Sequence, residues 1–190
     1  MPELELLDYG GGNLGSVRRC LERLGWSFVM VEVPSGSRPL ILPGVGAFGA
    51  VMAGLAGLRE RLRDLLRGGT PYLGICVGLQ ILLESSQESP GVAGLGLIPG
   101  EVVRYQAPKV PQMGWNDLRA CQPGWPDGFV YFVNSFYARP TDSGAVLYEA
   151  DYHGRFCAAL RSQNLTAFQF HPEKSGELGE QLLRRWKEQL

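Results

Sequence analysis

The chain has 190 residues, with 45% hydrophobic and 19% charged residues, so we expect one globular domain over residues 1–190 rather than a disordered chain. The formal net charge of −1 gives no indication of a nucleic-acid or membrane surface, and no apolar run is long enough to span a bilayer. The opening Met-Pro-Glu-Leu-Glu lacks a basic segment, so we expect no secretory signal and a cytoplasmic location.

The first half of the chain alternates strand and helix patterns. Apolar runs predict strands over residues 4–7, 28–33, 40–42 and 72–75. Helical spacing predicts helices over residues 14–24, over 48–66 with breaks near Gly54 and Gly57, and from residue 77 to 84. This order indicates a parallel sheet with helices on both faces.

The second half is richer in strand patterns. Strand-like runs cover residues 102–105, 129–133, 145–148, 156–160 and 167–170, with turn residues between them. We expect them to add mixed or antiparallel strands to the parallel core. Leu178, Leu182, Trp186 and Leu190 then recur four apart, which predicts a final amphipathic helix.

A cysteine stands where the fourth predicted strand meets a helix, in Gly74-Ile-Cys-Val-Gly78. This spacing matches a nucleophile elbow with Cys in place of Ser. Such a turn projects the Cys76 side chain above the strand end, and the N–H of Val77 then points toward a developing oxyanion. A helix N-terminus would also favour the Cys76 thiolate. The pentapeptide by itself fits a buried structural cysteine equally well.

A thiol nucleophile needs a base, and the chain has two histidines. His153 lies between two strand-like runs and is predicted to be a hairpin tip. His171 ends a strand, and Pro172 keeps its backbone extended, so that Glu173 can lie on the same side and hold the imidazole. Together with the elbow, these residues predict a Cys-His-Glu triad.

Two glycine-rich turns are further candidates for binding sites. Pro43-Gly-Val-Gly46 ends the third strand and could present N–H groups as the second half of an oxyanion hole, although an ordinary turn has the same pattern. Residues 10–15, Gly-Gly-Gly-Asn-Leu-Gly, fit the GxGxxG pattern of a dinucleotide site, with Glu32 twenty residues beyond Gly12. That alternative would leave the triad without a role.

The other three cysteines, Cys20, Cys121 and Cys157, lie far apart and form no CxxC pair. The sequence therefore predicts no zinc or other metal site, and we expect reduced thiols and no cofactor.

The motifs GICVGLQ, LPGVGAFG and FQFHPEKSG, in this order and at these separations, resemble those of class I (triad) glutamine amidotransferases. DYGGGNLGSV and PQMGWN narrow the resemblance to the glutaminase subunits of imidazole glycerol phosphate synthases, from about residue 4 to the last helix. The resemblance implies a three-layer, flavodoxin-like α/β domain with a mostly parallel central sheet and added antiparallel strands.

The resemblance also implies the chemistry. Cys76 attacks the side-chain amide of glutamine, His171 transfers the proton to departing ammonia, and Glu173 orients His171. A glutamyl thioester forms and is hydrolysed by water. Ammonia then passes to a cyclase partner with a (β/α)₈ barrel, where it reacts with an aminoimidazole-carboxamide ribonucleotide in histidine biosynthesis.

Further positions follow from the same motifs. The oxyanion would be held by the N–H of Val77 and by one from Val45 or Gly46. Glutamine would contact four residues: Gly44, Gln80, Ser135 and Phe136, the last two largely through their main chain. The cyclase would contact three: Asn13, Trp115 and Lys174.

One residue departs from the family pattern, because Asn134 stands where histidine is usual. Since its neighbours act through main chain, the change should affect fine tuning rather than the chemistry. Two alternatives stay open. The chain could serve another synthase, for anthranilate, aminodeoxychorismate or pyridoxal phosphate, or it could be a stand-alone γ-glutamyl hydrolase. A non-catalytic regulatory module would leave the intact triad unexplained.

Overall fold

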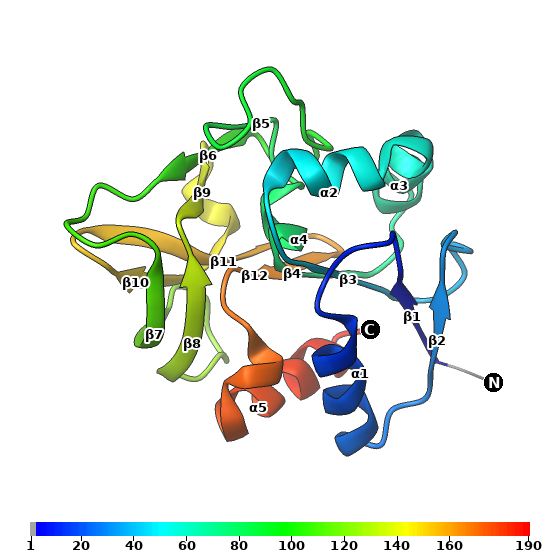
Figure 1. Ribbon diagram of the computed structural model, residues 1–190. Coiled ribbons are helices and arrows are strands. Elements are labelled where there is room, and N and C mark those ends of the chain that lie inside the picture. Colours follow the sequence, from blue (N-terminus) through cyan, green and yellow to red (C-terminus); the bar gives the residue numbers. More distant parts are fainter. Residues whose placement is uncertain (1–2) are drawn as a thin grey trace.

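The computed structural model describes residues 3–190, and a sheet of twelve strands runs through them (Figure 1). Its parallel core has the order β2-β1-β3-β4-β12. These strands are β1 (Leu4–Leu7), β2 (Phe28–Val31), β3 (Leu40–Gly44), β4 (Tyr72–Cys76) and β12 (Leu165–Phe168). Every residue of β1, β3, β4 and β12 is buried, as expected for parallel strands covered on both faces.

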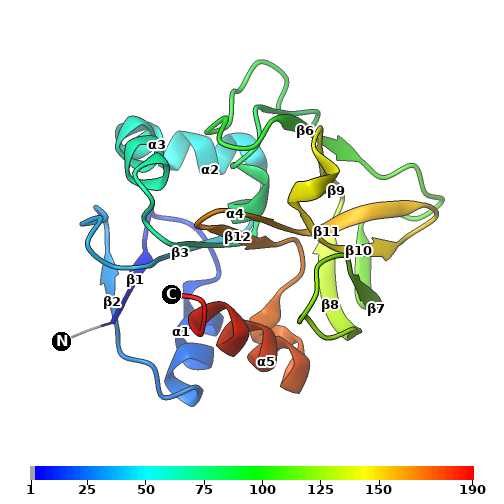
Figure 2. The same ribbon diagram turned by 180° about the vertical axis from the view of Figure 1, so that it is seen from behind.

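Helices cover both faces of this core. α1 (Leu14–Arg23) and α5 (Gly176–Lys187) lie on one face, and α2 (Phe48–Gly54), the 3₁₀ turn η1 (Ala56–Leu58) and α3 (Arg59–Arg67) lie on the other (Figures 1 and 2). The breaks predicted near Gly54 and Gly57 are confirmed, since the 48–66 region forms two helices joined by η1. Gly25 follows α1 with a φ of 71°, a conformation that suits glycine at a helix end.

The rest of the sheet is largely antiparallel. β11 (Arg155–Ser162) pairs with β12, and the path continues through β10 (Val146–Asp151), β7 (Gln112–Ala120) and β8 (Gly128–Asn134). The turn η2 (Ser143–Ala145) precedes β10. A branch holds β9 (Phe136–Pro140), β6 (Gly100–Arg104) and the two-residue β5 (Ser85–Ser86). The predicted strands of this half are confirmed, while β5, β7 and β9 were not predicted.

The predicted helix over residues 77–84 is wrong in length. α4 (Val77–Gln80) has only one turn, and residues 85–86 belong to a strand. The three residues after it, Ile81 to Leu83, are fully buried, so they do not present the polar outer face of a surface helix. Their carbonyl oxygens accept N–H groups from residues 95–98, which replace the bonds of a longer helix. The helix-dipole contribution expected at Cys76 is correspondingly small.

Candidate active site

Cys76 lies at the carboxyl end of β4 in a strained conformation, with φ 56° and ψ −110°. Glycine is needed on both sides of it. A Cβ on Gly74 would lie 2.5 Å from the Gly78 carbonyl oxygen, and a Cβ on Gly78 would lie 2.1 Å from the Leu42 carbonyl oxygen of β3. The buried Tyr72 hydroxyl donates to the Gly78 carbonyl at 2.7 Å and so ties α4 to β4. The predicted elbow is therefore present and tightly packed.

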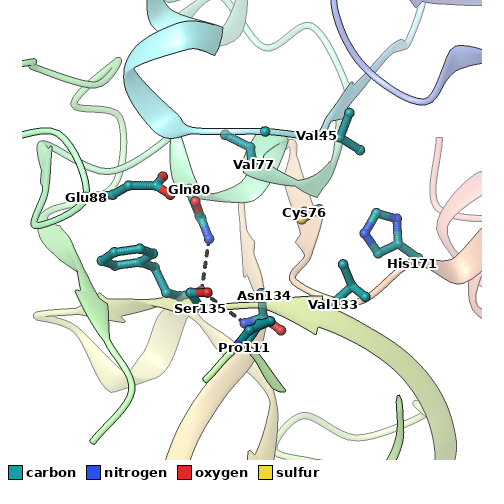
Figure 3. Close-up of a pocket in the computed structure, with 12 residues that line it drawn as sticks. Val45, Cys76, Val77, Gln80, Glu88, Pro111, Val133, Asn134, Ser135 and His171 are labelled. Atoms are coloured by element: carbon teal, nitrogen blue, oxygen red, sulfur yellow. Dashed lines mark hydrogen bonds between the residues drawn. The ribbon is translucent and has the colours of Figure 1, made fainter. Parts of the chain in front are cut away.

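His171 and Glu173 follow β12, the strand next to β4. His171 is extended, with φ −100° and ψ 94°, as its position before Pro172 predicts. The chain then enters the 3₁₀ turn η3 (Pro172–Lys174), which brings Glu173 Oε1 to 2.8 Å from His171 Nδ1. Both side chains are buried, with 3% and 1% exposure. Figure 3 shows the imidazole beside the Cys76 sulfur.

Two further contacts fix the His171 main chain. Its N–H donates to the Tyr131 carbonyl of β8 at 3.0 Å. The Ser175 hydroxyl donates to the His171 carbonyl at 2.7 Å and accepts the Tyr131 N–H at 3.0 Å. The base is thus held against the antiparallel half of the sheet.

The pKa of His171 is raised from 6.5 to about 10. Burial by itself lowers it, but the hydrogen bonds and charges of Cys76 and Glu173 outweigh that effect. The site therefore favours an imidazolium beside an anionic partner, which is the state that a thiolate nucleophile requires.

The other candidate groups lie apart from this cluster. His153 occupies the tip between β10 and β11 with a φ of 56°, which confirms the predicted hairpin. Burial raises the pKa of Cys20 to about 11 and raises that of Cys157 as well, so both thiols stay protonated. Cys121 is exposed.

A pocket of about 250 Å³ opens at Cys76 and His171 (Figure 3). Six of the predicted oxyanion and substrate residues line it: Val45, Gly46, Val77, Gln80, Ser135 and Phe136. Gly44 lies beneath it, paired in register with Cys76. A Cβ on Gly44 would lie 2.7 Å from the Gly78 nitrogen, so glycine is needed for β3 to approach the elbow.

The two sides of the predicted oxyanion hole differ. Val77 is buried and starts α4, whereas Val45 is 38% exposed and is followed by Gly46 with a φ of 95°. Burial raises the pKa of Tyr9 to about 12, and the Val45 amide opposes that rise. The Val77 side is therefore fixed by packing, whereas the Val45 side lies on an exposed turn at the pocket.

Gln80 is 3% exposed and both N–H bonds of its amide are used inside the protein. Nε2 donates to the Phe136 carbonyl at 3.0 Å and to Gln169 Oε1 at 3.1 Å. Asn134 Nδ2 also donates to the Phe136 carbonyl, at 3.0 Å, and to the Tyr105 hydroxyl at 2.9 Å. The Phe136 carbonyl is thus already occupied, so a ligand would meet the N–H side of this main chain.

Asn13, Trp115 and Lys174 lie on neighbouring elements. Asn13 precedes α1, Lys174 is in η3, which packs against both α1 and β8, and Trp115 is on β7, paired with Tyr131 of β8. Trp115 is 58% exposed and Lys174 is exposed, so this surface is open to a partner.

Sequence reasoning missed Glu88, Ser175 and Gln169. Glu88 lines the pocket from the loop after β5, and the Phe48 N–H donates to its Oε2 at 2.7 Å. Nothing in the local Ser-Gln-Glu-Ser pattern marks that position. Gln169 is different, since a polar residue between Phe168 and Phe170, at the end of a predicted apolar strand, is a visible exception in the sequence.

Within residues 3–190 no His, Cys, Asp or Glu side chains cluster in the numbers that would hold a metal ion. None of the helices described in that range is long and apolar enough to cross a membrane.

Comparisons with known proteins agree with the sequence motifs. Residues 5–188 match the family described as "Glutamine amidotransferase class-I". The chain is 46% identical over 194 residues to the imidazole glycerol phosphate synthase subunit HisH of Methanothermobacter thermautotrophicus, covering 97% of this chain and 98% of that protein. It is 48% identical over 183 residues to the subunit HisH of Thermus thermophilus, covering 92% and 91%.

Solved structures show the fold. A crystal structure of glutamine amidotransferase superposes with a TM-score of 0.80 at 22% identity, covering 98% of this chain and 97% of that one. PurLQS from Thermotoga maritima superposes with a TM-score of 0.77 at 18% identity, covering 99% and 98%. These neighbours confirm the predicted fold class.

Proposed function

Because the chain belongs to the class I glutamine amidotransferase family, and within it to the imidazole glycerol phosphate synthase subunits HisH, we propose that it hydrolyses glutamine and supplies ammonia to a synthase partner. The observation that carries this proposal is that Cys76 and His171 line one pocket, with the buried Glu173 bonded to His171 behind it. We propose that residues 1–190 act as one amidotransferase domain.

In the proposed reaction the Cys76 thiolate attacks the carboxamide carbon of glutamine. The tetrahedral intermediate collapses as the C–N bond breaks, and the imidazolium of His171 gives its proton to the leaving nitrogen, so that ammonia departs. His171, now neutral, takes a proton from water as the water attacks the thioester. Glutamate leaves and the thiolate and imidazolium are restored. Glu173 stabilises the imidazolium throughout.

The α-ammonium and α-carboxylate end of glutamine would be held at the far side of the pocket from His171. Since both N–H bonds of Gln80 are used, its Oε1 is left to accept a hydrogen bond from the ligand. The Glu88 carboxylate lines the same side, and Figure 3 shows it beside Gln80. Two oxygen acceptors, one of them charged, fit the α-ammonium group of glutamine. The main-chain N–H groups of Ser135 and Phe136 would hold its α-carboxylate.

The oxyanion would be held by the Val77 N–H and by an N–H of Val45 or Gly46. Because Val45 lies on an exposed turn between two glycines, we propose that rotation of the peptide between Gly44 and Val45 decides whether that amide serves. Glycine at positions 44 and 46 lowers the conformational energy that such a rotation requires. Losing one oxyanion donor costs about 10² to 10³ in rate, so we expect the resting chain to be slow.

The proposed partner is a cyclase subunit with a (β/α)₈ barrel, which would bind the surface of Asn13, Trp115 and Lys174. Relatives named as subunits of one synthase favour this over another synthase or a stand-alone hydrolase. We also propose a cytoplasmic location, because four free cysteines suit a reducing compartment.

The test is glutamate release from glutamine by the chain alone, with the cyclase, and with the cyclase and its nucleotide ligand. We expect activity to rise by orders of magnitude from the first to the third condition. Lys174→Ala or Trp115→Ala should weaken assembly or activation, while Arg67→Ala, an exposed cation on α3 across the sheet, should not. Full activity of the chain alone would refute the coupling, and no activity in any condition would refute the proposed function.

A further inference from the structure

Gln169 is an unusual neighbour for a nucleophile. It is a polar residue, yet its side chain is completely buried, between Phe168 and Phe170 just after β12. Its Nε2 lies 3.8 Å from the Cys76 sulfur, within hydrogen-bonding distance for sulfur. Its Oε1 accepts Gln80 Nε2 at 3.1 Å. A buried amide costs free energy unless its groups are bonded, and here one of its bonds goes to the reacting atom.

The direction of these bonds is fixed from the other end. The Phe136 carbonyl can only accept, so Gln80 must turn its N–H₂ group toward it. The second hydrogen of that group then points to Gln169, which must receive it with Oε1. Gln169 is left with its N–H₂ group facing the sulfur. The orientation of both side-chain amides therefore follows from one main-chain carbonyl, which can only accept a hydrogen bond.

An N–H donor beside sulfur favours the thiolate over the thiol, since a hydrogen bond to an anion is stronger than one to a neutral group. It also restrains the sulfur from a residue two positions before His171 in the chain. Cys76 thus has two polar neighbours, a base that exchanges a proton and an amide that cannot.

We propose that Gln169 is a positioning residue that donates a hydrogen bond to the Cys76 sulfur, and that Gln80 holds Gln169 in the donating orientation. This inference rests on the proposed function, because it assigns a role next to the proposed nucleophile. It gives Gln80 a second task besides contacting glutamine. Hydrogen bonds also connect the main chain at Phe136, where glutamine would bind, through Gln80 and Gln169 to the Cys76 sulfur.

The test is the pH dependence of Cys76 alkylation by iodoacetamide in the full chain without glutamine, followed on the Cys76 peptide by mass spectrometry. A hydrogen bond to an ionised group contributes about one to two pH units of preference for the ion. Gln169→Met, which keeps the volume and removes the donor, should raise the midpoint by about one pH unit. In the assembled synthase, kcat/KM for glutamine should fall by about tenfold. Gln80→Met should raise the midpoint in the same direction, although no substrate is present.

The matched control is Asn164→Ala. Asn164 donates to the carbonyls of Leu66 and Thr70 at the opposite end of β12, so its loss should lower thermal stability and leave the midpoint unchanged. If Gln169→Met does not fold, Gln80→Met decides the question by itself. Wild-type midpoints in the folded variants would overturn the proposal, as would an equal shift in Asn164→Ala. Inactivity of the wild-type synthase would instead refute the proposed function, because alkylation is measured without turnover.

Discussion

Gly78→Ala should disturb the packing of the elbow, because it adds a methyl group where α4 meets β3. In Gly78→Ala the added Cβ would lie 2.1 Å from the Leu42 carbonyl oxygen, whereas real contacts shorter than 3.0 Å essentially do not occur. α4 and β3 must therefore separate by about 0.9 Å, the difference between these distances. Neither side can yield by rotating a side chain, because the clash is with a backbone oxygen in a fully buried strand.

This separation should lower both the free energy of unfolding and the rate of turnover. Overpacking of a buried site costs about 1 to 3 kcal/mol, and for a chain of this size each kcal/mol lowers Tm by about 2 to 4 °C. The displaced α4 begins with Val77, directly after Cys76, and the strand it leaves ends at Gly44, directly before Val45. A misplacement of about 1 Å between reacting groups can lower turnover by about 10²-fold.

The assay is thermal unfolding of the chain together with glutamate release in the complete synthase. Gly57→Ala is the matched control, because Gly57 has a negative φ and nothing lies within 4 Å of its added Cβ. It should leave both measurements close to wild type. Gly78→Ala with wild-type Tm and wild-type turnover would refute the argument that close packing of β3 and α4 positions the nucleophile.

Three further predictions follow from the site. Cys76→Ala should abolish glutamate release while Cys20→Ala does not, and the synthase carrying Cys76→Ala should still run on added ammonium salts. His171→Ala should lose at least about 10² in turnover, whereas His153→Ala should stay within a few-fold of wild type; equal losses would contradict the assignment of the base. Because the pKa of His171 is raised from 6.5 to about 10, its stabilisation is complete below pH 6.5 and is lost as pH rises toward 10. The free energy of unfolding from urea titrations should fall over that range, and less so in Cys76→Ala, which removes one cause of the raised pKa.

The parts of the site that could be predicted from the sequence are those encoded within a few residues. Gly74 and Gly78 mark the elbow because the turn itself excludes side chains at these positions. His171 and Glu173 are two residues apart, and Pro172 restricts the backbone between them. Gly12, in the glycine run that fits a dinucleotide site, has a packing reason instead, since its Cβ would lie 3.1 Å from the carbonyl oxygen of the distant Pro43.

The parts that could not be predicted depend on distant partners. α4 ends early because the loop at residues 95–98 binds the carbonyl oxygens of residues 81–83, and nothing within residues 77–84 signals this. β7 was missed because its outer face carries the exposed Met113 and Trp115 around Gly114, so that no alternation marks it as a half-buried strand. Glu88 enters the pocket through a loop whose conformation is fixed by α2, more than thirty residues earlier in the chain.

The two halves of the site differ in rigidity, and this difference bears on where a partner could act. Cys76, His171 and Gln169 are almost completely buried and are bonded to strands on either side, so docking at the surface cannot readily move them. Val45 is 38% exposed, and Gly46 after it has open space around its Cβ position. We therefore expect a partner that switches the reaction on to act on the exposed peptide before Val45 rather than on the nucleophile and base. On this expectation the nucleophile and base stay in place, and the orientation of the Val45 N–H sets whether the oxyanion is stabilised.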